Sequence, residues 1–443
     1  MRCRINLRRV LSPNNPIPVL ATRARVTALG SAPGGAAPFG ATRDRLILQP
    51  ALRMAPATTS PGAGLGELVR TKKVIVCVGS GGVGKTTMSA AIGLKAAELG
   101  QRVCVLTIDP AKRLANAMGL TALSNTESRI ATDRIDGVRH PAGQLWAMML
   151  DTKRTWDDLV MRFALDPEQA KRILANHYYQ QISSALAGSQ EFMAMEKLYE
   201  LHESGKYDVL VLDTPPTRHA LDFLDAPKKM MGFMDEGVLR LFLTPSRMAG
   251  KLGFGFLKSS SAMMFKLLER ITGFEVLRDI ADFIGSFGGM HAGFRDRAGK
   301  VEEFLRAGGS SFVLVTSPNP LEVEEAEFFF RKLAEYRMPF GGFIVNRVHA
   351  DALKATGARE QWLRMRDHPA EILQSLGVTG ILAERMAEHF DRVQALAEMD
   401  AAEIAHLKKM CEGPHFWRTV PAFDLDVHDL SALARLNTYL FER

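Results

Sequence analysis

The chain has 443 residues, of which 47% are hydrophobic and 24% charged, values that are ordinary for a globular protein with a buried core. The formal net charge is +7, but residues 1–53 carry nine arginines and a single acid, so the rest of the chain is close to neutral. A nearly neutral body offers no basic face to a phosphate backbone, and no run of about 18 apolar residues is present, so we expect neither nucleic-acid binding nor a membrane-spanning helix.

The first segment, residues 1–65, is rich in Pro, Gly, Ala and Arg and has no hydrophobic period. This composition predicts a disordered basic tail. An Arg-rich, acid-poor beginning is also typical of an organelle transit peptide. A third interpretation is that translation starts at Met54, which would make the tail a mis-assigned start. The sequence leaves these three interpretations open.

From residue 72 onwards, short apolar runs alternate with helical patterns. The runs at 72–79 and 102–109 are joined by a helical stretch at 86–99, which predicts a βαβ unit. Further strands are predicted at residues 144–151, 207–213, 311–317, 341–348 and 417–423, separated by helical stretches such as 320–336. The pattern predicts an α/β fold with a doubly wound, mainly parallel sheet and helices on both faces.

A glycine-rich loop lies between the first run and the first helical stretch. It matches G-x-x-x-x-G-K-[ST], with the strand before it and the helix after it that this motif requires. Glycines allow successive backbone N–H groups to turn toward one anion, and the helix N-terminus adds its dipole. We predict ATP contacts from Gly79, Ser80, Gly81, Gly82, Val83, Gly84, Lys85, Thr86 and Thr87. Lys85 would reach the β- and γ-phosphates, and Thr86 would bind Mg²⁺.

Between residues 225 and 299 the strand signal disappears. Seven of the 21 methionines fall in residues 230–290, together with many Phe and Gly residues. With the helical stretches at 152–204, this segment predicts an α-helical subdomain inserted into the sheet domain. The predicted P-loop ATPase domain then comprises 66–151, 205–224 and 308–443, and the subdomain comprises 152–204 and 225–307.

The four cysteines, Cys3, Cys77, Cys104 and Cys411, contain no C-x-x-C pair. Cys77 and Cys104 lie within apolar runs, where a free thiol behaves as a small hydrophobic residue. We therefore predict no zinc site and no disulfide. A reducing, cytoplasmic location is expected, with peripheral attachment to a membrane as a variant.

Three motifs resemble those of a known family. The loop G-S-G-G-V-G-K-T-T resembles the deviant P-loop of the MinD, ParA, nitrogenase iron-protein and ArsA group. The segment that begins DPAKRLANAMG at Asp109 resembles switch I of ArsA and of its eukaryotic relative, the ATPase that targets tail-anchored membrane proteins. The segment DTPPTRHAL, which begins at Asp213, resembles their switch II. FIVNRV and TVPAFDLDV resemble the two segments of this family that contact adenine. The resemblance extends over about residues 72–440.

The resemblance implies a role for each matching residue. Asp109 would activate the attacking water, and Asp213 would hold a metal-bound water. Both follow predicted strands, where open α/β sheets bind ligands, but a helix N-cap would also favour aspartate. Pro216 and His219 would belong to switch II, and His219 would move with the γ-phosphate, although it could equally serve in packing or capping. Three further residues would surround the adenine base: Asn346, for which a simple turn role is the alternative, Pro421 and Phe423.

The sequence also departs from the family. The signature lysine at the second loop position, which reaches the partner's phosphates in the relatives, is Ser80 here. We expect either a substitute cation, from Arg218, Lys112 or Arg113, or weaker coupling of hydrolysis to dimer closure. The zinc-binding C-x-x-C of the eukaryotic relatives and the metalloid-binding cysteines of ArsA have no counterparts. A single P-loop per chain predicts a homodimer.

Three functions compete at this stage. The first is a nucleotide-switched ATPase that handles a hydrophobic client or a membrane protein, since flexible methionines suit promiscuous binding of apolar helices. The candidate client residues, which could equally form a core, are Met230, Met231, Phe233, Met234, Leu241–Leu243, Met263, Met264 and Phe265. The second is a motor subunit of an arsenite-type anion pump. The third is a MinD/ParA-like positioning ATPase, which would need a C-terminal membrane or DNA element, whereas residues 430–443 are predicted to pack on the sheet.

Overall fold

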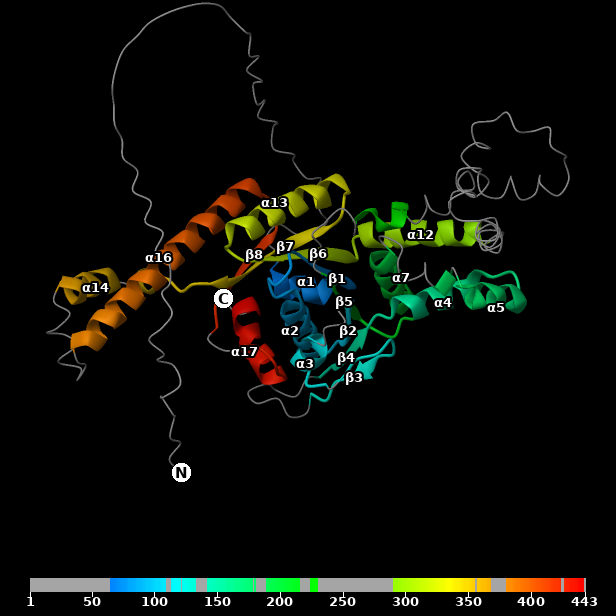
Figure 1. Cartoon of the computed structure of the whole chain (residues 1–443), viewed down its shortest axis with the longest axis horizontal. Helices are drawn as coiled ribbons and strands as arrows, with labels where there is room; N and C mark the ends of the chain where they lie inside the picture. The colour runs from blue at the N-terminus through cyan, green and yellow to red at the C-terminus, as the bar shows by residue number, and fades with distance from the viewer. Residues whose placement is uncertain are drawn as a thin grey trace, which may run out of the picture. The chain divides into compact units, whose positions relative to one another are not determined.

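The computed structural model describes residues 64–108, 113–120, 122–132, 142–177, 179–180, 189–215, 224–229, 290–354, 357–367, 380–423 and 426–441. These residues form a sheet flanked by helices (Figure 1). The strands are β1 (Val74–Val78), β2 (Arg102–Thr107), β3 (Ser128–Arg129), β4 (Gln144–Met149), β5 (Val209–Asp213), β6 (Ser310–Thr316), β7 (Phe340–Val348) and β8 (Phe416–Pro421).

The helices begin and end as follows: α1 (Leu65–Thr71), α2 (Lys85–Glu98), α3 (Arg113–Ala117), α4 (Thr152–Phe163), α5 (Pro167–Ala175), α7 (Ser189–Glu203), α12 (His291–Arg306), α13 (Pro320–Glu335), α14 (Ala358–Asp367), α16 (Gly380–Met410) and α17 (Leu430–Phe441). A short 3-10 helix, η2 (Ala352–Lys354), follows β7. None of the helices in these described ranges combines the length and the apolar character that a bilayer span requires.

The strand order of the sheet is β3-β4-β2-β5-β1-β6-β7-β8. All neighbouring pairs are parallel except β3 with β4. β1 lies in the middle: β2 to β5 occupy one side of it, and β6 to β8 occupy the other. The predicted doubly wound, mainly parallel sheet is confirmed. In such sheets the carboxyl ends of the strands beside the switch in winding direction form the ligand site.

Two hydrophobic cores lie on opposite faces of the sheet. In β1, Val74, Val76 and Val78 belong to one core, and Ile75 and Cys77 belong to the other, as the alternation of side chains along a strand requires. Helices α1, α2 and α17 pack on the second face, whereas α7, α12 and α13 pack on the first (Figure 1). The C-terminal helix α17 buries its leucines in the second core, as the sequence predicted.

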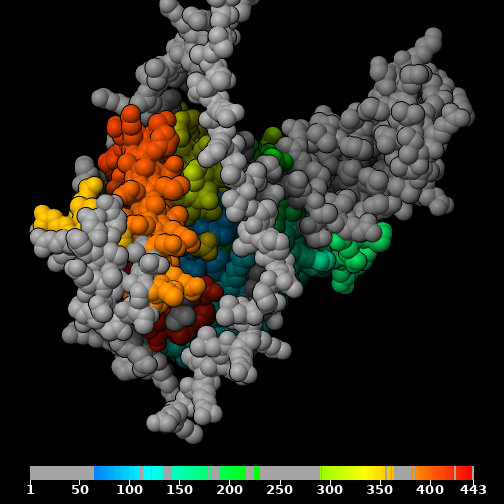
Figure 2. All heavy atoms as spheres, turned by 60° about the vertical axis from the view of Figure 1, so that its left-hand side comes forward, coloured from blue at the N-terminus to red at the C-terminus, as the bar shows by residue number. Residues whose placement is uncertain are grey.

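The strand β3 was not predicted. β3 is only two residues long, too short to show a period, and it adds an antiparallel edge to the sheet. The 31-residue helix α16 packs against α13, and its orange atoms contribute to the surface that Figure 2 shows. Several apolar side chains of α16 are exposed, among them Leu382 and Met399. The helix lies between β7 and β8, where the sequence predicted helical stretches that separate the strands.

Helices α4, α5, α7 and α12 fall in the stretches predicted as a helical subdomain. Trp156, Phe192 and Phe294 of these helices belong to the same hydrophobic core as β1 and β5. Buried polar contacts also join the helices: Arg297 of α12 donates to both carboxylate oxygens of Glu196 on α7, at 2.8 and 2.9 Å. The division into a sheet domain and a subdomain stays a prediction. Residues 1–63 and 230–289, with the tail and the candidate client residues, lie outside the described residues.

Candidate nucleotide site

The phosphate loop, residues 79–84, connects the carboxyl end of β1 to the first residue of α2, Lys85. Gly79, Gly82 and Gly84 have positive φ angles of 148°, 84° and 98°. A Cβ atom at Gly79 would lie 2.0 Å from the carbonyl oxygen of Val315, and a Cβ atom at Gly84 would lie 2.5 Å from Nδ2 of Asn346. The loop therefore requires glycine at both positions. With its backbone in this conformation at the N-terminus of a 14-residue helix, it can bind a phosphate.

Lys85 is 6% exposed, and its Nζ donates a hydrogen bond to the carbonyl oxygen of Ser80 at 2.7 Å. The ammonium group of Lys85 is thus held over the loop that precedes it. The hydroxyl of Ser80 donates to a carboxylate oxygen of Glu325 on α13. The second position of the loop therefore carries a neutral side chain in contact with an acid.

Asp213 connects the loop to the two neighbouring strands. It ends β5, beside β1, and is 1% exposed. Its Oδ2 accepts hydrogen bonds from the hydroxyls of Thr86 and Thr107, both at 2.8 Å. The following residue, Thr214, donates its hydroxyl to the carbonyl oxygen of Cys77 at 2.8 Å, which fixes the end of β5 against β1. A carboxylate and a hydroxyl in contact at a phosphate loop form an oxygen donor set that suits Mg²⁺.

Cys77 lies directly beneath the loop at the end of β1 and is fully buried. The pKa of its thiol is raised to about 12: burial is the largest cause and the Asp213 carboxylate acts in the same direction, while a hydrogen bond with Ser89 and the charge of Lys85 oppose the shift. The thiol is therefore protonated at neutral pH and contributes no charge to the site. Its role is packing, as the sequence predicted.

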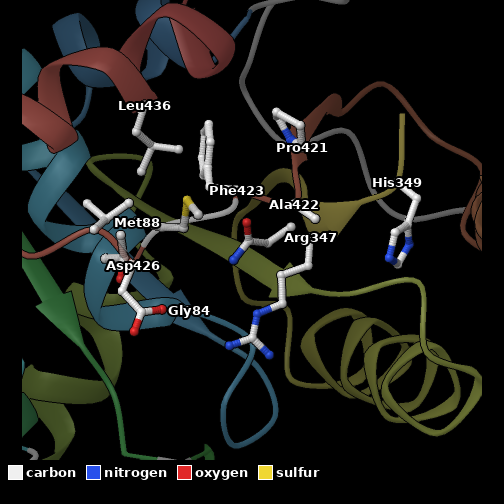
Figure 3. A pocket seen from close by; sticks show the side chains of 12 residues that line it. Gly84, Met88, Arg347, His349, Pro421, Ala422, Phe423, Asp426 and Leu436 are labelled. Carbon is white, nitrogen blue, oxygen red and sulfur yellow. The ribbon is translucent and has the colours of Figure 1, made fainter. Parts of the chain in front are cut away.

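A pocket with a volume of about 320 Å³ opens beside the end of the loop. The predicted adenine residues Asn346, Pro421 and Phe423, which lie up to 77 positions apart in the sequence, all line it (Figure 3). Asn346 is 9% exposed, and its Nδ2 donates to the carbonyl oxygen of Val83 at 2.9 Å. The remaining lining residues are Gly84, Thr87, Met88, Arg347, His349, Ala422, Asp426, Val427 and Leu436.

The structure therefore brings together the predicted loop residues, Asp213 and the three adenine candidates. Asp109, Pro216 and His219 lie outside the described residues, as do Lys112 and Arg218, which were considered as substitutes for the family's lysine. Arg113, the third candidate substitute, is the first residue of α3. In the described ranges, no group of three or more His, Cys, Asp or Glu residues is close enough to hold a metal ion by itself.

Sequence reasoning missed three residues of this site: Thr107, Glu325 and Arg347. Thr107 lies at the end of a predicted strand, two positions before Asp109, and this placement could have indicated a contact with the end of the neighbouring strand. Glu325 gave no signal, because it is one of several acids on α13. Arg347 follows a predicted adenine contact, but the sequence does not show the backbone turn that places it in the pocket.

Comparison with known proteins agrees with this site. Residues 72–375, more than half of the chain, match the family described as anion-transporting ATPase. The chain belongs to the anion-transporting ATPase family. The predicted resemblance to ArsA and its relatives is thereby confirmed, and nucleotide binding is a property that this family membership implies.

The individual relatives of this family member are distant in sequence. It is 29% identical to an ATPase ASNA1 homolog of Cryptosporidium parvum, over 63% of this chain and 66% of that protein. It is 26% identical to the ATPase get3 of Neurospora crassa, over 70% of this chain and 84% of that protein. A Halobacterium salinarum protein named for driving an arsenical pump is 32% identical, over 40% of this chain and 27% of that protein. The chain thus spans less than two thirds of the Cryptosporidium and Halobacterium relatives.

Proposed function

We propose that this member of the anion-transporting ATPase family binds ATP and hydrolyses it with Mg²⁺ as cofactor. The observation that carries the proposal is the contact between Thr86 and Asp213 at 2.8 Å, beside the buried Lys85. A hydroxyl, a carboxylate and an ammonium group thus meet at one glycine-rich loop. This is the set of side chains that a P-loop uses for nucleoside triphosphates.

The residues fit such a ligand. The loop cannot accommodate a Cβ atom at Gly79 or Gly84, and glycine at these positions allows the backbone conformation in which successive N–H groups can face a phosphate. In the proposal Lys85 binds the β- and γ-phosphates, the Thr86 hydroxyl and Asp213 hold the metal, the latter through water, and Asn346, Pro421 and Phe423 bind the base. Mg²⁺ supplies positive charge that neutralises the phosphate oxygens as the terminal phosphate is transferred.

Hydrolysis further requires a group that orients and activates the attacking water. We assign this role to Asp109, which follows β2 by two positions, with Pro216 and His219 as switch II residues that respond to the terminal phosphate. The Thr107 contact with Asp213 supports the assignment of Asp109, because it brings the carboxyl end of β2 to the end of β5. Asp109 follows the carboxyl end of β2 in the sequence, and the carboxyl ends of strands are where sheets of this kind bind their ligands.

For the wider role, we propose a nucleotide-switched homodimer that handles a hydrophobic client or a membrane protein. The support is the single P-loop of the chain and the similarity to ATPase get3 proteins over most of their length. The Met- and Phe-rich residues 225–299 are the proposed client segment. An alternative is the motor of an anion pump, which the family description and the Halobacterium relative favour.

The central proposal is tested by nucleotide binding to the full chain. Lys85→Ala should abolish tight binding of Mg·ATP, because the phosphates lose the ammonium of the loop, and Lys95→Ala on the same helix should not. Asp109→Asn should keep ATP binding and slow hydrolysis by orders of magnitude. Unchanged ATP affinity in the Lys85→Ala protein would remove the proposal.

The client role needs a separate measurement. The hydrolysis-blocked Asp109→Asn protein should retain a hydrophobic helix in the presence of ATP and release it in the presence of ADP. Serine substitutions at Met230, Met231 and Phe233 should weaken this capture with little change in melting temperature. Destabilisation with normal capture would show that these side chains form a core, and it would leave the pump motor as the better candidate.

A further inference from the structure

Arg347 has a backbone conformation that is unusual for its residue type. It has a φ angle of 59°, and within the described ranges only one other non-glycine residue, Arg337, also has a positive φ angle. This left-handed conformation is unfavourable for a residue with a Cβ atom. At Arg347 it coincides with an irregularity in the pairing of β7 with β8, between Val345 and Val348. Strained residues and bulges of this kind often re-aim a side chain at a functional site.

The effect of this irregularity is to place two consecutive side chains in one pocket. Phe343 and Ile344 of β7 belong to opposite cores, as expected for a regular strand. An uninterrupted strand would therefore direct Asn346 and Arg347 to opposite faces. Instead, both line the pocket beside the phosphate loop. Figure 3 shows Arg347 extending away from Pro421 and Phe423, toward the blue ribbon that carries the loop.

The guanidinium of Arg347 has no polar partner among the described residues. In the part of the chain that the structure describes, it makes no hydrogen bond and no ion pair, although Asp426 lines the same pocket. Arg347 is also exposed at the mouth of the pocket, so its charge is available to a ligand. A guanidinium with five donors is the side chain best suited to bind phosphate oxygens.

We propose that Arg347 is a nucleotide-binding residue whose guanidinium contacts the phosphate chain, at the end that adjoins the nucleoside. This inference rests on the proposed ATP site. Arg347 shares its pocket with Gly84 and Thr87, where the phosphate loop passes into α2, while Lys85 is held at the other end of the loop through Ser80. The two cations would thus neutralise different parts of the same phosphate chain.

Binding measurements on the full chain test this assignment. Arg347→Ala should weaken ADP and ATP about tenfold, as expected for the loss of a charge-assisted hydrogen bond at a partly exposed site, and should leave adenosine binding unchanged. Arg347→Lys should lose less nucleotide affinity than Arg347→Ala, because lysine keeps the positive charge but lacks the paired N–H donors of the guanidinium. Equal losses for adenosine and ADP would show that Arg347 contacts the nucleoside, and unchanged ADP affinity would show that it contacts no part of the ligand; either result overturns the proposal.

Arg347→Gly separates binding from folding. Glycine adopts a positive φ angle without strain, so this variant should melt at the same temperature as the wild type or higher, and still bind ADP about tenfold more weakly. Arg337→Gly is the matched control. Arg337 has a φ angle of 56° and lies just before the first residue of β7, at the other end of the strand from Arg347. This variant should show a similar change in melting temperature with unchanged ADP affinity. If the two variants bind ADP equally, the proposal is wrong.

The outcome is distinguishable from failure of the ATP site itself. A wild-type protein that binds neither ADP nor ATP would remove the proposed function. A wild-type protein that binds both nucleotides in a Lys85-dependent way, with no contribution from Arg347, would remove only this inference.

Discussion

Ser80 of the phosphate loop and Glu325 of α13 are 245 positions apart in the sequence, and a hydrogen bond from the Ser80 hydroxyl to the Glu325 carboxylate joins them. The contact places a negative charge next to a loop whose N–H groups and lysine attract anions. The family resemblance described in the sequence analysis implies a lysine at this position of the loop, where this chain has Ser80. Here the loop and α13 are connected by a contact that opposes, rather than assists, phosphate binding.

Removing this negative charge should strengthen nucleotide binding. We expect Glu325→Gln, which keeps an acceptor for Ser80, to bind ATP about two- to fivefold more tightly, the range of a solvent-accessible charge interaction. Titration of ATP into the full-length protein at low and high salt measures the effect, which should shrink at high salt because exposed charges are screened.

The matched control is Glu324→Gln, which makes the same change of charge one position earlier on α13. Glu324 is exposed, and it has no hydrogen bond or ion pair within the described residues. Its ATP affinity should stay close to that of the wild type. If both variants gain affinity equally, the effect comes from net charge and not from the Ser80 contact.

Gly84→Ala should damage both folding and binding. The φ angle of 98° is strained for alanine, and the new Cβ atom would displace Asn346 from its hydrogen bond with Val83. We expect a loss of about 2–4 kcal/mol in the free energy of unfolding, together with weaker ATP binding.

The control Gly205→Ala measures the cost of the positive φ angle alone, because Gly205 has a φ angle of 61° and no atom within 4 Å of the added Cβ. It should cost about 1–2 kcal/mol and leave ATP affinity unchanged; similar losses in both variants would contradict the contact with Asn346.

The second stability prediction concerns the buried ion pair between Glu196 and Arg297. Burial raises the pKa of the Glu196 carboxyl, while the hydrogen bonds from Arg297 oppose this shift. Arg297→Met should cost about 3–5 kcal/mol of unfolding free energy, because the buried Glu196 charge would keep, among the described residues, only the more distant Arg162 guanidinium, at 3.8 Å. Denaturant unfolding of the double variant Glu196→Leu/Arg297→Met should recover most of this loss. A double variant as unstable as the single one would show that packing, and not charge, is lost.

His415 makes the stability of the protein depend on pH. Its ring lies among Phe330, Phe340, Phe343 and Trp417, with centroid distances of 5.1–5.5 Å. Burial lowers the pKa of His415 to about 4, whereas an unfolded histidine titrates near about 6.5. The unfolded state therefore binds more protons between these values, so the stabilisation is complete above pH ~6.5 and declines as the pH falls toward 4.

Urea unfolding at several pH values measures this contribution. Allowing for partial exposure of the ring, we expect the wild type to lose about 1–2 kcal/mol more than His415→Phe between pH 7 and pH 5. If the unfolding free energies of the two proteins change equally with pH in this range, His415 binds the same number of protons in the folded and unfolded states, and the prediction is wrong.

Much of the fold could be predicted because it depends on the hydrophobicity of short segments of the sequence. The apolar runs of β1, β2, β4 and β5 are buried on both faces of the sheet, and a strand of this kind needs continuous hydrophobicity, which is visible without any partner. The phosphate loop could also be predicted, because the positive φ angles within residues 79–84 require glycine and are therefore marked by glycines in that short segment.

Other features depend on partners that are distant in sequence. β3 is only two residues long, and it forms only by pairing with β4. The adenine candidates could be named from their motifs. Their convergence on one pocket beside Gly84 follows from the positions of β7 and β8 in the sheet.

The sequence by itself determined the parallel α/β fold, the phosphate loop and the family, because each of these depends on patterns of residues that are close together along the chain. The tertiary structure alone decided which side chains face the loop. Thr107 reaches Asp213 because β2 and β5 are neighbours, and Glu325 reaches Ser80 because α13 follows β6, the strand beside β1. Arg347 enters the pocket because β7 turns out of register there. These contacts arise from strand order and backbone irregularity, which no short segment of the sequence specifies.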